Sequence, residues 1–243
     1  MSESDAEIAR ARLLEIVPGG FEEIAGGGWI ELAAYTDRAG EARMRDAFAD
    51  VVVRLVAGGW EDRWREFHRP VHVAGLWIGP PWEWTTETEP AVVVDPGRAF
   101  GTGAHPTTRA CIELLARLER GRLLDAGCGS GVVAVAAVRL GYAPVLALDV
   151  DPVAVEVARA TARRNGVDVE VRQADVLVDE IGEADVVVAN IELRVVEALL
   201  RWRSAPTAVT SGYLACDVPR TAGWARVARL ELEGWAADVS MAK

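Results

Sequence analysis

The sequence predicts an α/β protein in which a small α+β unit precedes a doubly wound parallel sheet. Three observations support this prediction. Beyond Asp95, short apolar runs alternate with helical segments, which is typical of a parallel sheet covered by helices on both faces. A glycine-rich turn joins the first of these runs to a helix, and the first 57 residues show a different, glycine-interrupted pattern. A chain of 243 residues with 51% hydrophobic side chains is long enough to bury such a core.

Residues 1–57 are expected to form the small α+β unit. Residues 4–7, Ser-Asp-Ala-Glu, resemble the capping box of a short helix, which Pro18 and the two glycines after it would end. Residues 21–35 predict a strand, a glycine turn and a second strand. Residues 41–50 then have helical character, and the β-branched run 51–56 predicts another strand.

Residues 58–90 are expected to be a tryptophan-rich linker. Five of the nine tryptophans lie in the stretch 60–84. Trp60, Trp64 and Phe67 are spaced for one helical face, and a Gly-Pro-Pro sequence at 79–81 would stop any regular element. These aromatic side chains are expected to bury the linker against the domains, and an aromatic surface for substrate is the alternative.

Residues 91–243 carry the alternating pattern of the sheet. Pro152 suits the first turn of a helix, and Asn165 with Gly166 suits a helix end. The C-terminal part predicts a closing hairpin around Glu233 and Gly234, although Glu-Gly is a weak turn signal. The expected strands are residues 122–125, 145–149, 169–172, 185–190 and 207–211, and the expected helices are residues 107–118, 131–140, 152–165, 192–202 and 219–227.

The glycine-rich turn lies within residues 123–131, Leu-Leu-Asp-Ala-Gly-Cys-Gly-Ser-Gly. Its glycines are Gly127, Gly129 and Gly131, and they allow a close approach of the backbone to a ligand. A dinucleotide-binding turn has the different spacing Gly-x-Gly-x-x-Gly and faces a pyrophosphate. Asp125, two residues before this turn, would repel a pyrophosphate and attract an ammonium group. These four residues are therefore expected to bind S-adenosylmethionine, whose methionine part carries an ammonium group.

Three acidic residues follow the second and third strands of the predicted sheet. Asp149 ends the second strand, where a carboxylate can accept both ribose hydroxyls of a cofactor. Asp151 faces another way by strand alternation and is expected to cap a helix. Asp175 is placed to accept from the adenine amino group, and a solvated loop acid is the alternative.

Two further candidates lie at the end of the fourth strand and in the loop before the first. Asn190 ends a buried strand beside the topological switch point, where ligands bind in these folds, and is expected to position the nucleophile. A strand-end asparagine with a structural role is the alternative. The loop 95–108 holds three glycines and several hydroxyls that suit a cover over a cofactor. Its His105 is either a catalytic base or a histidine bonded within the loop.

Composition excludes several functional classes. The net charge of −11 argues against a nucleic-acid binder, and it suits a basic protein substrate or simply a soluble surface. Cys111, Cys128 and Cys216 form no Cys-x-x-Cys pair, and the three histidines have no metal-ligand spacing. We therefore expect neither a disulfide framework nor a metal site. The acidic start lacks a signal-peptide core, and no long apolar run predicts a membrane span. A cytoplasmic protein is expected.

The string Phe-Gly-Thr-Gly-x-His-Pro-Thr-Thr at residues 100–108, read with residues 125–131, Asp149 and Asn190-Ile191, resembles one known family. These are the methyltransferases that modify large-subunit ribosomal protein eleven. The resemblance runs from about Trp60 to Gly212. It implies a class I methyltransferase fold, a Rossmann-like doubly wound sheet with a reversed seventh strand. It also implies a ferredoxin-like domain for substrate recognition at the N-terminus.

The resemblance further implies transfer of methyl groups to lysine side-chain amines and to the N-terminal amine of that basic ribosomal protein. A monomer without direct contact to nucleic acid or membrane is expected. No Asn-Pro-Pro or Asp-Pro-Pro motif of a nucleic-acid methyltransferase follows the fourth strand. The residues that the resemblance assigns to cofactor binding are Thr107, Thr108, Gly127, Asp149 and Asn190, with Phe100 and His105 in the matching loop.

The chain departs from the family pattern in two places. Where the family usually has Asn-Ile-Leu-Ala, Glu192 follows Asn190 and Ile191, so an acid lies near the acceptor amine. We interpret Glu192 as a helix cap, and attraction of the ammonium form is the alternative. The N-terminal domain also looks truncated by about one strand, which leaves two other functions open. These are a lysine methyltransferase of another protein and a non-catalytic protein that binds S-adenosylmethionine.

Overall fold

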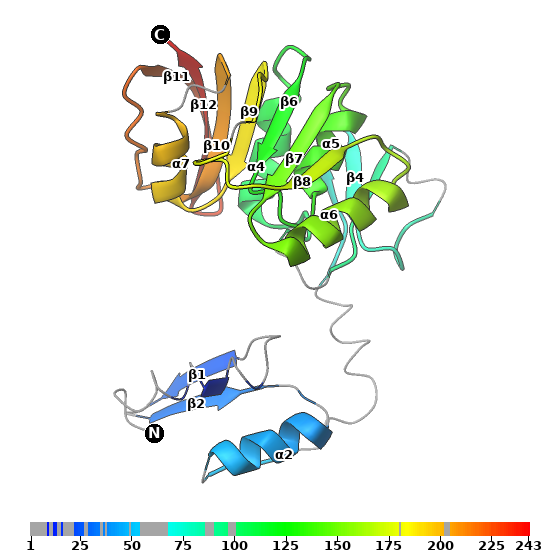
Figure 1. Cartoon of the computed structure of the whole chain (residues 1–243), viewed down its shortest axis with the longest axis vertical. Coiled ribbons are helices and arrows are strands. Elements are labelled where there is room, and N and C mark those ends of the chain that lie inside the picture. Colours follow the sequence, from blue (N-terminus) through cyan, green and yellow to red (C-terminus); the bar gives the residue numbers. More distant parts are fainter. Residues whose placement is uncertain are drawn as a thin grey trace. The chain divides into compact units, whose positions relative to one another are not determined.

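The chain divides into two compact units, Met1–Glu61 and Asp62–Lys243, and each is described by itself (Figure 1). The computed structural model describes residues 9, 12–13, 16, 22–26, 29–34, 36, 38–48, 50–53, 68–85, 90–96, 101–179, 181–201 and 205–243. Among these residues, the structure contains no helix that is both long and apolar enough to cross a membrane.

The first unit contains an antiparallel hairpin and a helix. Strands β1 (Glu22–Gly26) and β2 (Trp29–Ala33) pair as the expected two strands, while residues 27 and 28 between them lie outside the described residues. Helix α2 (Arg38–Ala47) begins three residues before the expected helix. The strand expected over 51–56 is wrong for Val51–Val53, which adopt no regular structure, and its remainder lies outside the described residues. Val52 is 82% exposed, and a β-branched run forms a strand only where neighbouring strands cover it. The helix expected near residue 4 begins outside the described residues.

The second unit is built on a seven-stranded sheet with the order β11-β12-β10-β9-β6-β7-β8. The last five strands of that order run parallel, and β12 is antiparallel to both of its neighbours. This is the reversed strand that the family resemblance implied, and the fold is the class I methyltransferase sheet. The strands are β6 (Leu123–Ala126), β7 (Val145–Asp149), β8 (Glu170–Gln173), β9 (Val186–Asn190), β10 (Thr207–Leu214), β11 (Trp224–Leu232) and β12 (Trp235–Ala242).

Helices cover the two faces of this sheet unequally (Figure 1). One core joins β6, β7, β9, β10 and β12 to helices α4 (Pro106–Leu115), α5 (Val132–Arg139) and α6 (Pro152–Arg164). A second core on the other face contains α7 (Leu193–Leu199) and loop side chains such as Leu177 and Ile181. Successive residues of a strand enter different cores, as Val186 and Val187 do, because side chains alternate across a sheet.

Part of the expected linker belongs to the folded second unit. Strands β3 (Val71–Val73), β4 (Leu76–Gly79) and β5 (Ala91–Val93) form a separate three-stranded sheet. Ile78 and Val92 are buried in the same core as α5. The side chain of Asn165 bonds both backbone groups of Val93, at 2.7 and 2.8 Å. Residues 71–73 and 76–79 therefore form strands, and Trp60, Trp64 and Phe67 lie outside the described residues.

The helix expected over 219–227 is wrong, because β11 begins at Trp224. Trp224 is buried, and its indole donates to the Leu200 carbonyl at 2.6 Å. The bulge between Arg226 and Ala228 shifts the register of β11 and breaks the alternation that would have revealed a strand. Pairing with β12 therefore overrides the helix signal of Pro219.

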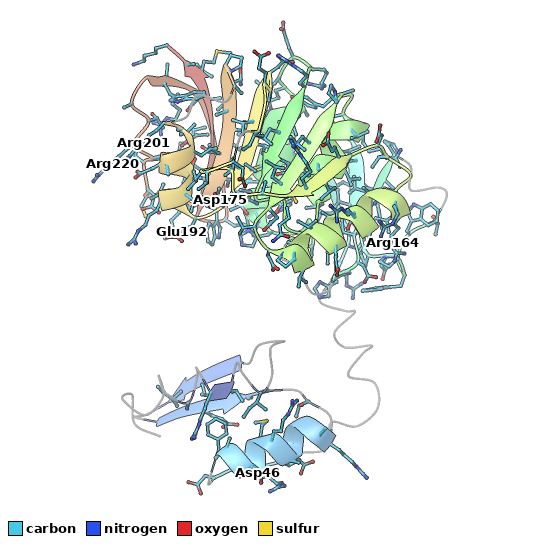
Figure 2. All side chains as sticks on the ribbon, in the orientation of Figure 1. Asp46, Arg164, Asp175, Glu192, Arg201 and Arg220 are labelled. Atoms are coloured by element: carbon cyan, nitrogen blue, oxygen red, sulfur yellow. The ribbon has the colours of Figure 1, made fainter. Side chains whose placement is uncertain are left out.

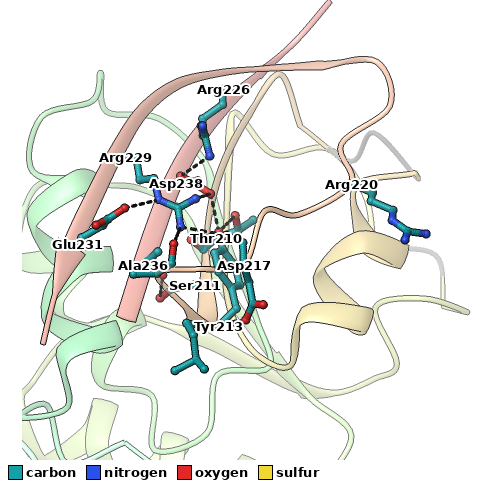
Figure 3. Close-up of polar contacts among 12 residues, drawn as sticks. Thr210, Ser211, Tyr213, Asp217, Arg220, Arg226, Arg229, Glu231, Ala236 and Asp238 are labelled. Atoms are coloured by element: carbon teal, nitrogen blue, oxygen red, sulfur yellow. Dashed lines mark hydrogen bonds and ion pairs between the residues drawn. The ribbon is translucent and has the colours of Figure 1, made fainter. Parts of the chain in front are cut away.

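A buried polar network joins β10, β11 and β12 on the face that carries α7 (Figure 3). The Tyr213 hydroxyl lies 3.1 Å from Asp238, and Arg229 bonds the same carboxylate oxygen at 3.3 Å. Arg229 also donates to the carbonyls of Ala215 and Asp217 in the loop after β10. Burial raises the pKa of Asp238 although the Arg229 charge lowers it. Tyr213 of this network directly follows the bulge at Gly212, where the register of β10 shifts.

Candidate active site

The candidate site lies at the carboxyl ends of β6, β7, β9 and β10. These strands are parallel, so their ends meet at one edge of the sheet. The chain leaves β6 in the direction of β7 and later returns to the other side of β6 as β9. Ligands of doubly wound folds bind at such a switch point. Apart from Asp175, which follows β8, and Phe100, the residues expected to bind the cofactor come from these strand ends and from the N-terminus of α4.

The glycine turn leaves the end of β6 in a backbone conformation that favours glycine. Gly127, Gly129 and Gly131 have φ values of +75°, +53° and +77°. A Cβ on Gly127 would lie 2.4 Å from the Ile191 side chain, and one on Gly131 would lie 3.0 Å from the backbone of Ala158. Both packing and conformation therefore require glycine at these two positions.

Asp149 ends β7 beside this turn. Its Oδ2 accepts from the Gly129 amide at 2.9 Å, and its Oδ1 accepts from the Asp151 amide at 3.0 Å. Each carboxylate oxygen has a further lone pair, so the group can still accept from hydroxyls of a ligand. Asp151 accepts from the Val153 amide at 2.8 Å and caps α6, as predicted.

Asp125 lies in the interior below the turn and is 2% exposed. Burial raises its pKa to about 7, a hydrogen bond from the Ala134 amide lowers it, and the Asp149 charge raises it further. Its Oδ2 is buried without a hydrogen-bond partner among the described residues. A buried carboxylate in this state is a favourable neighbour for a cation.

Asp175 lies in the loop after β8, next to the end of β7 (Figure 2). The amide of Ala174 donates to the Asp149 carbonyl at 3.0 Å, which places this loop beside Asp149. The Asp175 carboxylate accepts from the Leu177 amide at 2.9 Å and stabilises a local turn. Contact of Asp175 with adenine therefore stays a prediction.

The loop before α4 contacts the glycine turn and then begins the helix. Ser130 donates from its hydroxyl to the Gly101 carbonyl, so loop and turn are directly bonded. His105 is the N-cap of α4, and its Nδ1 accepts from the Thr107 amide and lies 2.7 Å from the Thr107 hydroxyl. Thr107 and Thr108 are each 1% exposed. Phe100 lies outside the described residues.

Asn190 meets this loop at the end of β9. Its Nδ2 donates to the Thr108 hydroxyl at 3.3 Å. A cavity of about 300 Å³ opens beside the pair. The residues that line it are His105, Thr107, Asn190, Ile191, Glu192, Gly212 and Trp235.

Two of the lining residues correct or extend the predictions. Glu192 is the N-cap residue of α7, but its side chain makes no capping bond, so our interpretation of it as a cap is wrong. Its side chain is 72% exposed at the cavity and lies 4.0 Å from that of Arg194. Trp235 was missed: it follows the hairpin turn, and its ring meets that of His105 at 5.0 Å, edge to face. Burial lowers the pKa of His105, and the nearby Arg109 charge lowers it further.

Comparison with known proteins identifies the family. The profile of the family described as ribosomal protein L11 methyltransferase (PrmA) matches residues 31–216. A ribosomal protein L11 methyltransferase of Symbiobacterium thermophilum is 40% identical over 198 residues, covering 75% of this chain and 65% of the relative. The protein of the same name from Dictyoglomus thermophilum is 39% identical over 175 residues, covering 68% of this chain and 57% of the relative.

A solved structure supports the same relationship. The crystal structure of ribosomal protein L11 methylase from Lactobacillus delbrueckii subsp. bulgaricus superposes with a TM-score of 0.62 at 25% identity. The superposed region covers 69% of this chain and 95% of the chain in that crystal structure. The chain spans about half to two thirds of the length of the curated relatives named above. With the family profile matching more than half of its length, the chain belongs to the ribosomal protein L11 methyltransferase family.

Proposed function

We propose that this chain transfers methyl groups from S-adenosylmethionine to amines of a protein, with ribosomal protein L11 as the substrate. The observation that carries the proposal is the cavity at the ends of β9 and β10. Its walls include the apolar side chain of Ile191 and the ring of Trp235, and Asn190 and Glu192 supply an amide and a carboxylate. A long aliphatic side chain that ends in an amine matches this set of groups.

The described residues fit the proposed cofactor. The partnerless buried oxygen of Asp125 suits the ammonium group of the methionine part, and Asp149 suits the ribose hydroxyls. The turn at Gly127 and Gly129 has a backbone without side chains that would obstruct a ligand. When bound, the cofactor supplies an electrophilic methyl group on a sulfonium. Asp125, Gly127, Gly129, Gly131, Asp149 and Asp175 would hold it, together with Phe100, Thr107 and Thr108.

Asn190 is the residue that we propose to orient the acceptor. Its Nδ2 is directed to Thr108, so its carbonyl oxygen is left to accept from an amine N–H. Such a bond points the nitrogen lone pair away from Asn190. Correct alignment of the two reactants supplies a large part of the rate in reactions of this type.

The acceptor must react as the neutral amine, although a free lysine has a pKa near 10.4. Apolar walls such as Ile191 and Trp235 disfavour the charged form once the side chain has entered. Glu192, exposed at the cavity, attracts the ammonium form before entry. Burial and the Arg109 charge lower the pKa of His105, so its imidazole is neutral. Its Nδ1 already accepts from the Thr107 amide, which favours a histidine bonded within the loop over a catalytic base.

The N-terminal unit is proposed to recognise the protein substrate. Its hairpin β1–β2 and helix α2 form a compact unit of their own. The chain's net charge of −11 favours encounter with a basic ribosomal protein.

A labelling experiment tests the proposal. The purified chain is mixed with methyl-labelled S-adenosylmethionine and a ribosomal extract, and each labelled protein is identified by mass spectrometry. Label on L11 is the expected result, and recombinant L11 should then be labelled as a single component. Label on a different protein would identify another lysine methyltransferase. Cofactor binding by calorimetry without label on any protein would favour the non-catalytic alternative.

A further inference from the structure

The turn between β11 and β12 brings Trp235 to the cavity. This two-residue turn consists of Glu233 and Gly234, whose φ values of +51° and +83° are both positive. Two positive φ values are the signature of the tight hairpin turn that suits the twist of a β-ribbon. Glycine adopts this conformation readily, whereas glutamate does so rarely. A contact made by the Glu233 side chain is therefore expected to offset the cost of this backbone conformation.

The Glu233 side chain contacts α4, more than 120 residues away in the sequence. Its Oε1 lies 2.5 Å from a terminal nitrogen of Arg109. Arg109 is in the first half of α4, and its side chain is 24% exposed. Its Nε is buried without an acceptor among the described residues, so Glu233 is the partner that the structure provides for this guanidinium.

The ion pair lies beside two walls of the cavity. His105, the N-cap of the same helix, and Trp235, the first residue of β12, are both lining residues. Their rings meet edge to face at 5.0 Å. The Arg109 charge lowers the pKa of His105, and the Glu233 charge raises it. On its other side the turn is bonded through the Gly234 carbonyl to the Ala215 amide at 2.8 Å.

We propose that Arg109 and Glu233 are positioning residues that hold Trp235 against His105 and so set the shape of the acceptor cavity. The expected effect on the acceptor KM rests on the proposed function, because it requires that the cavity binds the acceptor amine. Neither residue lines the cavity, so each acts through its neighbour: Arg109 through His105 on α4, and Glu233 through Trp235 on the hairpin. The pair determines how well the acceptor side chain is held and has no direct part in cofactor binding.

The test compares Glu233→Gln, Arg109→Gln and the charge-swapped variant Arg109→Glu/Glu233→Arg with the wild type. Arg117→Gln is the matched control, since it removes an ion pair between Arg117, just past the end of α4, and Glu113 on that helix. With recombinant L11 as acceptor, the acceptor KM should rise roughly tenfold in both single variants. The KM for S-adenosylmethionine and kcat should change less than about twofold. The swapped variant should recover most of the acceptor KM.

A spectroscopic measurement tests the geometry without turnover. His105 is one of three histidines in the chain, so its ring signals are assignable by NMR with the help of a His105→Gln variant. The nuclear Overhauser contact between the His105 and Trp235 rings should weaken in Glu233→Gln and return in the swapped variant. An unchanged ring contact and acceptor KM in Glu233→Gln would overturn the proposal. If the wild type labels no acceptor, the proposed function fails, and the ring contact alone decides the positioning role.

Discussion

The amide of Asn190 and the hydroxyl of Thr108 meet at 3.3 Å and join the end of β9 to the first turn of α4. Thr108 is 1% exposed, so the bond lies away from solvent. Because Thr108 takes the Nδ2 group, the orientation of the Asn190 amide is fixed and its carbonyl is available to a ligand.

Asn190→Ala is expected to reduce transfer far more than cofactor binding. The carbonyl that orients the acceptor is lost, and we expect kcat to fall by roughly 100-fold while cofactor affinity stays within about tenfold. Initial rates with recombinant L11 and calorimetry with S-adenosylhomocysteine measure the two quantities. Thr108→Val is the companion variant: it removes the bond that fixes the amide and also the proposed contact of Thr108 with the cofactor. Calorimetry separates these two effects, and at saturating cofactor its kcat should lie between those of Asn190→Ala and the wild type. Equal turnover of Asn190→Ala and wild type would exclude Asn190 from the chemistry.

Asp149→Ala is expected to weaken cofactor binding by about 100-fold. The carboxylate supports the glycine turn through the Gly129 amide and is proposed to accept the ribose hydroxyls. A hydrogen bond to a charged group contributes about 1.5–3 kcal/mol, which corresponds to one or two factors of ten. Calorimetric titration with S-adenosylhomocysteine measures the change.

Asp151→Ala is the control for that variant. Asp151 caps α6 without contact to the glycine turn, so its loss should lower the free energy of unfolding by about 1 kcal/mol. Its affinity for S-adenosylhomocysteine should remain that of the wild type. A similar loss of affinity in both variants would mean that general destabilisation, and not the Asp149 carboxylate, is responsible.

Asp125 is expected to make the stability of the second unit depend on pH. Its pKa is about 7 in the folded chain and near 3.8 when unfolded. Between pH 3.8 and pH 7, Asp125 is ionised in the unfolded chain but protonated in the folded chain. The free energy of unfolding therefore falls as pH rises through this range, and the whole loss is present above pH 7. At 1.36 kcal/mol for each unit of pKa, the penalty is of the order of 4 kcal/mol. Asp125→Asn should remove this part of the pH dependence.

Urea unfolding from pH 5 to pH 8 measures the effect. The variant should be more stable than the wild type at pH 8 and should bind S-adenosylhomocysteine more weakly, because the counter-charge for the ammonium group is gone. Parallel pH profiles of wild type and variant would show that Asp125 stays ionised in the folded chain.

The predictable parts of the fold and site are those that local pattern determines. The glycine turn, Asp149 and Asn190 follow apolar runs whose strands the structure confirms, because parallel strand ends share one edge of the sheet. Trp235 reaches the cavity only through the β11–β12 hairpin, whose tip contacts a helix far away in sequence. The hairpin predicted around Glu233 and Gly234 is confirmed, but the first part of β11, from Trp224 to the bulge, was assigned to a helix for a related reason, because the bulge is a tertiary feature.

Glu192→Gln is expected to raise the acceptor KM without changing the cofactor KM. The carboxylate lines the cavity, is 72% exposed and makes no capping bond, so its remaining effect on an incoming amine is electrostatic. An exposed carboxylate attracts an ammonium group only weakly, and salt screens this attraction further. We therefore expect the acceptor KM to rise by only roughly threefold, and only at low ionic strength.

The effect of Glu192 should decline as sodium chloride is raised from about 20 to 300 mM, since a Debye length of about 8 Å at physiological salt screens the attraction. Glu156→Gln is the control, because Glu156 is an exposed glutamate on α6 outside the cavity lining. The same salt-dependent change in both variants would assign the effect to the net charge of the chain. A change confined to Glu192→Gln would assign it to the cavity entrance, next to the amide that orients the acceptor.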